Sequence, residues 1–526
     1  MSAAFATPQL HLFDLHDRRV LVLGLGDSGM AMARWAAHCG ARVRVADTRS
    51  VDGSDLPQWQ RLREQEGAAG HAFEYASGEP WSAHWLDGVD LVAWSPGLSI
   101  ELGEPARFHA LARERGIAVA GELELFAQAL ADLRESGYVP RVLAVTGTNG
   151  KTTTTALAAH LCRGAGMDVR TAGNIGPAML EALREAVVAA ALPQVWVLEL
   201  SSFQLALADS FSADAAAILN VSEDHLDWHA SMDSYAAARQ RIFAHGAVAV
   251  FDRGDPATAP RRAEGLARAG AQGAPEATAR ITFGTDAPQA AGDFGLVRDG
   301  ALVWLAQAVA DEDTAAGARR RRQPVAFTIR RLMPADALRI RGVHNQLNAL
   351  AALALCSAIG VPLARMLHAL REYAGEPHRC RTIAVIDGVE YVDDSKGTNV
   401  GATIAALEGL GRRCRLIAGG EGKGQDFAPL AGPVGRHAAA VYLIGRDAPR
   451  LRAALAGAGV PLVDCAGLDE AVERAAADAR SGEAVLLSPA CASFDMFRNY
   501  AHRAEAFAQA VRRLAEARGV AMDGSC

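Results

Sequence analysis

Residues 141–161 read RVLAVTGTNGKTTTTALAAHL, and this stretch sets the fold class that we expect for the chain. An apolar strand runs into a glycine loop that carries Lys151, and a helix follows. In such a unit backbone amides and an ammonium surround phosphate oxygens, while the hydroxyl of Thr152 can ligate Mg²⁺. The standard P-loop spacing has glycine six positions before the lysine, where this chain has Val145. The stretch therefore predicts a compacted phosphate-binding loop in an α/β domain.

Lysine is rare in this chain, and its positions are informative. Of the 53 basic residues only Lys151, Lys396 and Lys423 are lysine, and all others are arginine. Each lysine stands in a loop rich in glycine, serine or threonine after an expected strand. Because an ammonium is a compact point charge and a guanidinium a broad planar fork, a tight anion site favours lysine. We interpret the three lysines as ligand-binding residues; the alternative is that they were retained by chance.

The composition indicates an ordinary globular protein. Of the 526 residues 50% are hydrophobic and 21% charged, and this length suggests about three or four domains. The first 19 residues lack the pattern of a signal peptide, and no apolar run of roughly 18 residues occurs. The eight cysteines form no CxxC pair, which favours a reducing compartment. We therefore expect a cytoplasmic protein without membrane insertion.

The net charge of -7 provides no basic field for nucleic acid. The run Arg319–Arg322 is the one exception, and its Ala/Gly/Arg-rich surroundings indicate a solvated insertion. More broadly, residues 255–335 show only weak strand signals at RITFGT and ALVWLA, and we interpret them as a peripheral elaboration. No nucleic-acid partner is expected.

A second glycine loop occurs near the start of the chain. A strand at 20–23 runs into Gly24-x-Gly26-x-x-Gly29, a helix follows, and the next strand ends at Asp47. The glycines of such a βαβ unit let amides approach a diphosphate at the helix N-terminus. Two interpretations stay open here: a dinucleotide site with Asp47 on a ribose, or another nucleotide or diphosphate pocket.

Later strands also end in polar residues. Glu199 follows the strand in VWVLELSS, and His225 follows the strand in DAAAILNVSEDH. In a parallel, doubly wound sheet these side chains would face the same crevice as Lys151. A carboxylate there suggests Mg²⁺, which tolerates imidazole less readily. After a Gly/Pro-rich junction at 373–381, strands and helices alternate again. Polar residues again follow the strands of this third unit: Asp394, Lys396, Thr398, Lys423 and Ser493.

Taken together these segments resemble the Mur ligases, and the match runs through all three units in order. The motifs that carry the resemblance are TGTNGKTTT (146–154), GNIG (173–176), ELSSFQL (199–205), NVSEDHLD (220–227), HNQLNALAA (344–352), EPHR (376–379), DDSKGTN (393–399), GGEGKGQDF (419–427) and LSPACASFDMF (487–497). DSKGTN and SPACASFDMF resemble the members that add D-glutamate. The resemblance implies three α/β domains: Rossmann-like over 1–140, a central P-loop ATPase-type parallel sheet over 141–373, and Rossmann-like over 374–526.

The resemblance also implies an activity. Such an enzyme is an ATP- and Mg²⁺-dependent ligase that adds D-glutamate to UDP-N-acetylmuramoyl-L-alanine through an acyl phosphate, in peptidoglycan precursor synthesis. A monomer that closes its last domain over the others is expected.

Site residues follow from the resemblance by position. UDP-sugar binding falls to Gly26, Asp27, Ser28, Asp47, Thr48, Arg49, Ser95, Pro96, Gly97, Asn174 and Ser201. ATP binding falls to Gly147, Thr148, Asn149, Gly150, Lys151, Thr152, Thr153, Asn345, Asn348, Arg379 and Asp394. Asn345 and Asn348 are three residues apart and so share one helix face. The metal ligands are Thr152, Glu199 and His225; the amino-acid site is Thr398, Lys423, Ser493 and Tyr500; and the catalytic residues are Lys151, His225, Lys396 and Lys423.

Two positions depart from the family pattern. Members of the family commonly carry a carbamylated lysine where this chain has Arg239, and arginine cannot form that carbamate. We hypothesise a weaker or differently ligated second Mg²⁺, helped by Glu223, Asp224 or Asp227. Tyr500 stands where an apolar aromatic is more usual, which affects the amino-acid pocket.

Three alternative functions are considered. A sister amide ligase would use another amino acid or a folate. An NAD-dependent dehydrogenase would use GLGDSG and Asp47, but would leave TGTNGKTTT and DDSKGTN without a role. A non-catalytic nucleotide-binding regulator would bind ATP without turnover.

Overall fold

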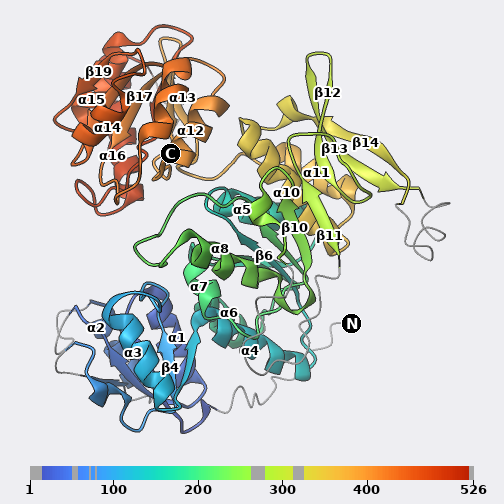
Figure 1. Cartoon of the computed structure of the whole chain (residues 1–526), viewed down its shortest axis with the longest axis vertical. Helices are drawn as coiled ribbons and strands as arrows, with labels where there is room; N and C mark the ends of the chain where they lie inside the picture. The colour runs from blue at the N-terminus through green and yellow to red at the C-terminus, as the bar shows by residue number, and fades with distance from the viewer. Residues whose placement is uncertain are drawn as a thin grey trace. The chain divides into compact units, whose positions relative to one another are not determined.

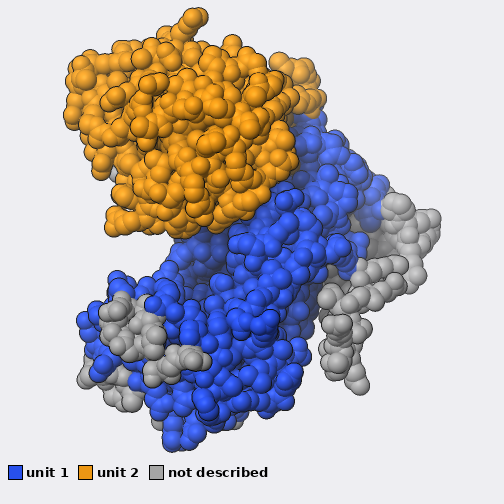
Figure 2. All heavy atoms as spheres, turned by 60° about the vertical axis from the view of Figure 1, so that its left-hand side comes forward, with its two compact units in different colours: residues 1–297, 306–332, 349–370 blue, residues 298–305, 333–348, 371–526 orange. Residues whose placement is uncertain are grey.

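The computed structural model describes residues 15–49, 57–69, 73–76, 80–261, 279–311 and 325–520. The run Arg319–Arg322 and the first 14 residues, on which two of the predictions above depend, lie outside these ranges. The chain forms two compact units (Figure 2). The first unit holds residues 1–297, 306–332 and 349–370, and the second holds 298–305, 333–348 and 371–526. Each is described by itself.

The N-terminal part of the first unit is a parallel five-stranded sheet in the order β3-β2-β1-β4-β5. Figure 1 labels its strand β4 together with helices α1, α2 and α3. Its strands are β1 (Arg19–Leu23), β2 (Arg42–Ala46), β3 (Phe73–Tyr75), β4 (Leu91–Trp94) and β5 (Ala118–Gly121). Its helices are α1 (Asp27–His38), α2 (Pro57–Ala69), η2 (Ala83–Leu86) and α3 (Gly103–Glu114). The two strands predicted around the first glycine loop are confirmed as β1 and β2.

The central sheet is also parallel and has the order β11-β10-β9-β6-β8-β7. Its strands are β6 (Arg141–Thr146), β7 (Val169–Gly173), β8 (Val195–Glu199), β9 (Ala215–Ile218), β10 (Val248–Asp252) and β11 (Arg280–Phe283). The surrounding helices are α4 (Glu122–Glu135), α5 (Lys151–Gly164), α6 (Met179–Val188), α7 (Ser202–Ala206), α8 (Met232–Gln240), η3 (Arg241–Gly246), η4 (Pro256–Thr258), α10 (Val343–Ala358) and α11 (Leu363–Glu372).

The interpretation of 255–335 as a peripheral elaboration is wrong for part of that region. β11 pairs with β10 in register Phe251↔Thr282 and is the edge strand of the central sheet. The side chain of Phe283 is buried, so this strand is part of the core and not a peripheral addition. A separate three-stranded sheet contains β12 (Phe294–Asp299), β13 (Leu302–Ala310) and β14 (Phe327–Pro334), and η6 (Ala335–Ala337) follows it.

The second unit has a six-stranded sheet in the order β15-β16-β20-β17-β18-β19. β15 (Arg381–Ile386) runs antiparallel to β16 (Val389–Asp393), and the other neighbours are parallel. The remaining strands are β17 (Cys414–Gly419), β18 (Ala438–Ile444), β19 (Leu462–Asp464) and β20 (Ala484–Leu487). Its helices are α12 (Val400–Gly409), η7 (Ala428–Leu430), α13 (Ala431–His437), α14 (Ala448–Leu455), α15 (Leu468–Asp478) and α16 (Tyr500–Ala517).

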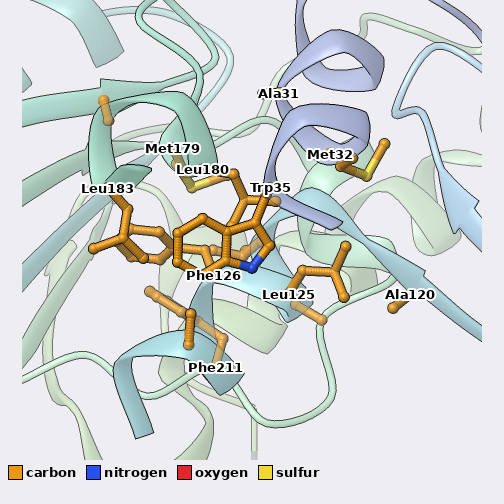
Figure 3. Packing of buried hydrophobic residues seen from close by; sticks show 14 of the residues in the cluster. Ala31, Met32, Trp35, Ala120, Leu125, Phe126, Met179, Leu180, Leu183 and Phe211 are labelled. Atoms are coloured by element: carbon orange, nitrogen blue, oxygen red, sulfur yellow. The ribbon is translucent and has the colours of Figure 1, made fainter. Parts of the chain in front are cut away.

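One hydrophobic core joins the first two sheets. Trp35 of α1, Phe126 of α4 and Leu180 of α6 are fully buried in the same cluster (Figure 3). Each large apolar side chain buried in this way stabilises the fold by about 1.5–3 kcal/mol. The shared core therefore fixes the position of the first glycine loop relative to the carboxyl edge of the central sheet. No helix of the described residues is both long and apolar enough to cross a membrane.

Candidate active site

The loop of residues 146–151, here called the phosphate loop, joins β6 to α5. Gly147 has φ +148°, and a Cβ there would lie 3.0 Å from Leu219 Cβ, so the close approach of β9 requires glycine. Asn149 N donates to Asn220 Oδ1 at 2.8 Å, and Asn220 Nδ2 donates back to Asn149 O at 3.0 Å. Asn220, which follows β9, therefore holds the loop in place. The loop leads into the N-terminus of α5, where free backbone amides favour an anion.

Lys151 is the first residue of α5 and folds back over the loop. Its Nζ donates to Gly147 O at 2.6 Å and to Thr148 O at 2.9 Å. These carbonyls hold the ammonium above the amides that would face phosphate oxygens. The placement fits the sequence-based prediction of a compact cation at a tight anion site.

Glu199 ends β8, the strand beside β6, and lies at the same sheet edge as the phosphate loop. Its Oε1 accepts a hydrogen bond from Asn174 Nδ2 at 3.0 Å, whereas its Oε2 is buried and has no hydrogen-bond partner. A buried carboxylate oxygen without a partner is costly unless a cation binds it. This oxygen fits a hard divalent cation such as Mg²⁺.

His225 follows β9 and lies within electrostatic range of Lys151, as its position in the sequence predicts. Burial lowers the pKa of His225, and the Asp224 carboxylate opposes that effect. The charges of Lys151 and Arg239 lower this pKa further. Charges of both signs therefore surround His225, with Asp224 and Asp227 opposing Lys151 and Arg239.

The hypothesised helpers of a second metal do not assemble into a site. Asp224 Oδ2 lies 3.6 Å from His225 Nε2, but no group of three or more His, Cys, Asp or Glu poised for a metal occurs within the ranges that the structure describes. Arg239 is buried nearby, with only 1% of its surface exposed. Its guanidinium places positive charge where the family pattern would have a carbamate, so the residues present do not fit a second divalent ion.

A cavity of about 490 Å³ opens within the first unit, beside the first glycine loop. All eleven residues predicted to bind the UDP-sugar line it, from Gly26 of the first loop to Asn174 and Ser201 of the central sheet. Convergence of strand ends explains this result, because each predicted residue follows the carboxyl end of a parallel strand. The cavity thus runs from the first glycine loop to the edge that carries Glu199.

Aromatic residues of the cavity were missed by the sequence analysis. Trp81, Trp85 and Phe203 line it together with the predicted residues. Trp81 precedes η2 and Trp85 lies within it, in the segment EPWSAHWLDG, where two tryptophans four residues apart are the available signal. Flat apolar surfaces of this kind suit a nucleobase or sugar face.

Asp47 is engaged inside the protein. Its Oδ2 accepts from Leu25 N at 2.7 Å and from Arg49 Nη2 at 2.7 Å. Burial alone would raise the pKa of Asp47, but hydrogen bonds from Arg49 and Leu25 N outweigh it and leave the pKa below its ordinary value. A carboxylate bonded in this way fixes the first glycine loop and the Arg49 side chain beside the cavity.

Glu122, which the sequence analysis also missed, contacts the first glycine loop through a hydrogen bond with Ser28. It is 1% exposed, accepts from Ser28 Oγ at 2.6 Å, and accepts from Leu180 N at 3.1 Å. Burial raises the pKa of its carboxyl. Glu122 therefore ties the loop to the N-terminus of α6.

The second unit carries the other predicted ATP-binding residues. Asn348 Nδ2 donates to Asn345 Oδ1 at 3.2 Å, which confirms that both face the same side of α10. Asp394 is buried and accepts from Ser488 Oγ at 2.7 Å and from Cys380 N at 3.2 Å. Burial raises the pKa of Asp394 to about 7, against the opposing hydrogen bond of Ser488 and the charge of Arg379.

The predicted amino-acid residues also lie in the second unit. Lys396 Nζ lies 5.2 Å from the ring centroid of Tyr500, and Lys423 Nζ lies 5.8 Å from that of Phe494. Phe494 is 64% exposed and was not predicted. Ser493 is buried beside it, and Thr398 N donates to Lys396 O at 3.0 Å. Two cations thus stand over aromatic faces in loops that follow β16 and β17.

Arg503 of α16 organises these loops, although nothing in the sequence distinguishes it from solvent-exposed arginines. It is 1% exposed and donates from Nη2 to Ser395 O at 2.7 Å and from Nη1 to Cys491 O at 3.1 Å. It therefore joins the loop of Lys396 to the loop of Ser493.

Comparison with known families decides the identity of this arrangement. The Mur ligase MurD-like N-terminal domain matches residues 18–121, the Mur ligase middle domain matches 145–356, and the Mur ligase glutamate ligase domain matches 378–491. The chain belongs to the Mur ligase family. As a Mur ligase it is an ATP-dependent amide ligase, so the predicted enzyme class and three-part α/β fold are confirmed and the dehydrogenase alternative is not supported.

Close relatives span almost the whole of this Mur ligase. The UDP-N-acetylmuramoylalanine–D-glutamate ligase of Burkholderia pseudomallei (strain 668) is 57% identical over 510 residues, which cover 96% of this chain and 98% of the relative. The enzyme of the same name from Burkholderia mallei (strain SAVP1) is 57% identical over 511 residues, with the same coverage.

Solved structures share the fold at low identity. The MurF ligase of Thermotoga maritima in complex with ADP has a TM-score of 0.54 and 15% identity, and the match covers 96% of this chain and all of that one. UDP-N-acetylmuramate-alanine ligase MurC of Thermotoga maritima has a TM-score of 0.52 and 19% identity, with coverage of 95% and 100%.

Proposed function

We propose that this Mur ligase joins D-glutamate to UDP-N-acetylmuramoyl-L-alanine with hydrolysis of ATP to ADP and phosphate, in peptidoglycan precursor synthesis. One observation carries the proposal: the cavity beside the first glycine loop collects all eleven expected UDP-sugar residues and reaches Asn174, which hydrogen-bonds Glu199 next to the phosphate loop. A sugar nucleotide held there would direct its carboxylate toward the nucleotide site. Relatives of 57% identity carry the same activity in their names.

The chemistry assigned to the phosphate loop is charge neutralisation and alignment. A carboxylate oxygen of the UDP-sugar substrate attacks the γ-phosphorus of ATP, ADP leaves, and an acyl phosphate forms. Both reactants are anionic, so the ammonium of Lys151 and the amides at the start of α5 offset their repulsion. The amine of glutamate then attacks the acyl carbon, phosphate leaves, and the nitrogen loses a proton. Alignment of this kind supplies on the order of 7–11 kcal/mol.

Mg²⁺ is assigned to Glu199 and Thr152, because the unpartnered Glu199 Oε2 lies at the edge of the phosphate loop. The ion would further offset the charge of the phosphates. In Glu199→Gln the Mg²⁺ concentration that gives half-maximal activity should rise roughly 10- to 100-fold, since an anionic ligand is lost. A Mg²⁺ titration of ADP formation measures this, and an unchanged midpoint contradicts the assignment. His225 is assigned to the substrate carboxylate without a second metal.

The amino-acid substrate is assigned to the second unit. Lys423, Thr398 and Ser493 would bind the glutamate carboxylates, and the ring of Tyr500 would pack beside Lys396. Asn345, Asn348, Arg379 and Asp394 are assigned to the nucleotide.

ADP formation with UDP-N-acetylmuramoyl-L-alanine tests the function. We expect turnover with D-glutamate and at least about 100-fold less with L-glutamate, because a fixed pair of carboxylate sites discriminates between enantiomers. Preference for another amino acid, or for a folate, would instead identify a sister ligase. ATP binding without any turnover would identify a regulator.

The cellular location and assembly state belong to the same proposal. We place the enzyme in the cytoplasm, where ATP and UDP-sugars occur, and expect a monomer. Cell fractionation and light scattering measure the two properties.

A further inference from the structure

Arg239 is buried at the end of α8 beneath the phosphate loop. Its Nη1 donates to Thr146 Oγ1 at 2.6 Å, its Nη2 donates to the hydroxyl of Tyr235, and the guanidinium lies 4.4 Å from the centroid of the Tyr235 ring. Its Nε is buried and has no hydrogen-bond partner. The cation is thus held by two hydroxyl groups and one aromatic face.

Among the described residues none of the ion pairs within 4.0 Å includes Arg239. Its charge lowers the pKa of His225 together with that of Lys151, while the carboxylates of Asp224 and Asp227 raise that pKa. A buried, unpaired guanidinium is unfavourable for the free protein, and an anion that binds nearby would relieve that cost.

The hydrogen bonds of Arg239 do not explain why the charge is there. Thr146 Oγ1 also donates to Leu200 O at 2.7 Å, and the hydroxyl of Tyr235 also pairs with Thr148 Oγ1 at 3.0 Å. If the guanidinium were removed, neither hydroxyl would be left without a partner. An unbranched apolar side chain of similar length would therefore leave no orphaned polar group.

The same contacts connect Arg239 to the phosphate loop. Thr146 begins the loop, and Thr148 lies within it and accepts from Ser222 N at 3.0 Å. Arg239 reaches Thr146 directly and Thr148 through Tyr235. Its charge is therefore held in place by hydrogen bonds to two residues of the phosphate loop, one direct and one through Tyr235.

We propose that Arg239 is a positioning residue that supplies a fixed internal cation to the nucleotide site, and that the triphosphate of ATP is its missing counter-charge. The inference rests on the proposed function. In this chain the fixed cation also takes the place of a second divalent ion, so one divalent ion per chain suffices. The unpaired charge of Arg239 thereby increases the affinity for nucleotide and lowers the stability of the nucleotide-free protein.

Arg239→Met separates this role from a structural one. With a non-hydrolysable ATP analogue and Mg²⁺, the variant should bind roughly 5- to 20-fold more weakly, as expected for loss of one charge at close range. The melting temperature of the free variant should equal or exceed that of the wild type. Arg239→Lys, measured in CO₂-free buffer, should keep the affinity within about threefold because it keeps the charge.

Arg241→Met is the matched control, since Arg241 follows on the same segment but pairs with Asp209. It should leave nucleotide affinity unchanged. An Arg239→Met protein that fails to fold, or melts lower when free, overturns the inference, as does an unchanged affinity. If the wild type itself does not bind the analogue, the proposed function fails instead.

Counting bound Mn²⁺ checks the second consequence. Electron paramagnetic resonance of the wild type saturated with the ATP analogue should show one tightly bound Mn²⁺ per chain. Two tightly bound ions would overturn the substitution of a cation for a metal.

Discussion

The first unit contains two glycine loops, each of which joins a strand to a helix. They differ in the charged side chains that contact them. Beneath the first loop the carboxylates are satisfied internally: Asp47 pairs with Arg49, and Glu122 accepts from Ser28. This loop offers hydrogen bonds and a wide cavity with little unbalanced charge.

Two cations lie close to the phosphate loop. Lys151 lies over it, and Arg239 lies under it without a carboxylate partner among the described residues. The two loops thus share a backbone plan but differ in the charged side chains that contact them, and the proposed function assigns a sugar nucleotide to one and a triphosphate to the other.

The largest expected effect comes from the cation of the phosphate loop. Lys151→Ala should lower kcat by at least about 1,000-fold, because the transition state loses its main fixed charge, while UDP-sugar affinity stays unchanged. Lys151→Arg should lose nearly as much, since a planar fork does not fit between Gly147 O and Thr148 O. Steady-state kinetics and UDP-sugar titration measure both. A Lys151→Arg enzyme within about tenfold of wild type would refute the requirement for a compact ammonium.

A smaller effect is expected at the first loop. Ser28→Ala removes a hydroxyl that lines the cavity, and it should raise KM for the UDP-sugar about fivefold, equivalent to about 1 kcal/mol. KM for ATP should not change. Ser136→Ala, at the end of α4 and away from the cavity lining, is the matched control. An equal rise in both KM values would show that the two loops are not independent.

The smallest effect is a pH dependence of stability confined to the first loop. Burial raises the pKa of Glu122 above its ordinary value of 4.5, so its contribution to stability is full below about 4.5 and is lost as pH rises through the folded-state pKa. The melting temperature of Glu122→Gln minus that of the wild type is therefore expected to be about 2–4 °C higher at pH 8 than at pH 5. Differential scanning calorimetry at the two pH values measures it. A melting-temperature difference that is larger at pH 5 than at pH 8 would contradict this prediction.

The two loops also show what could be predicted from sequence. Gly24, Gly26 and Lys151 have local signatures, because a strand, a glycine turn and a helix occur in one short segment. The cavity residues converged because parallel strands bring their carboxyl ends to one edge. Glu122 and Arg503 could not be predicted, since their partners are distant in sequence and an acidic or basic residue on a helix normally faces solvent.

The fold shows the same division. The strands predicted from apolar runs, such as β1, β6, β8 and β17, occur in the parallel sheets, whereas short strands such as β3 and β19 and the antiparallel pairing of β15 with β16 have no distinct pattern. β11 appeared peripheral because a compositionally biased stretch precedes it, and its pairing with β10 depends on a contact that no local pattern encodes.

The cluster of Trp35, Phe126 and Leu180 bears on how this enzyme can be engineered. Because α1 and α6 pack together there, the N-terminal five-stranded sheet and its helices cannot be removed as an independent module, and cutting them away would expose a broad apolar face prone to aggregation. A chimera that borrows this module from a relative must import α4 and α6 with it to remain soluble.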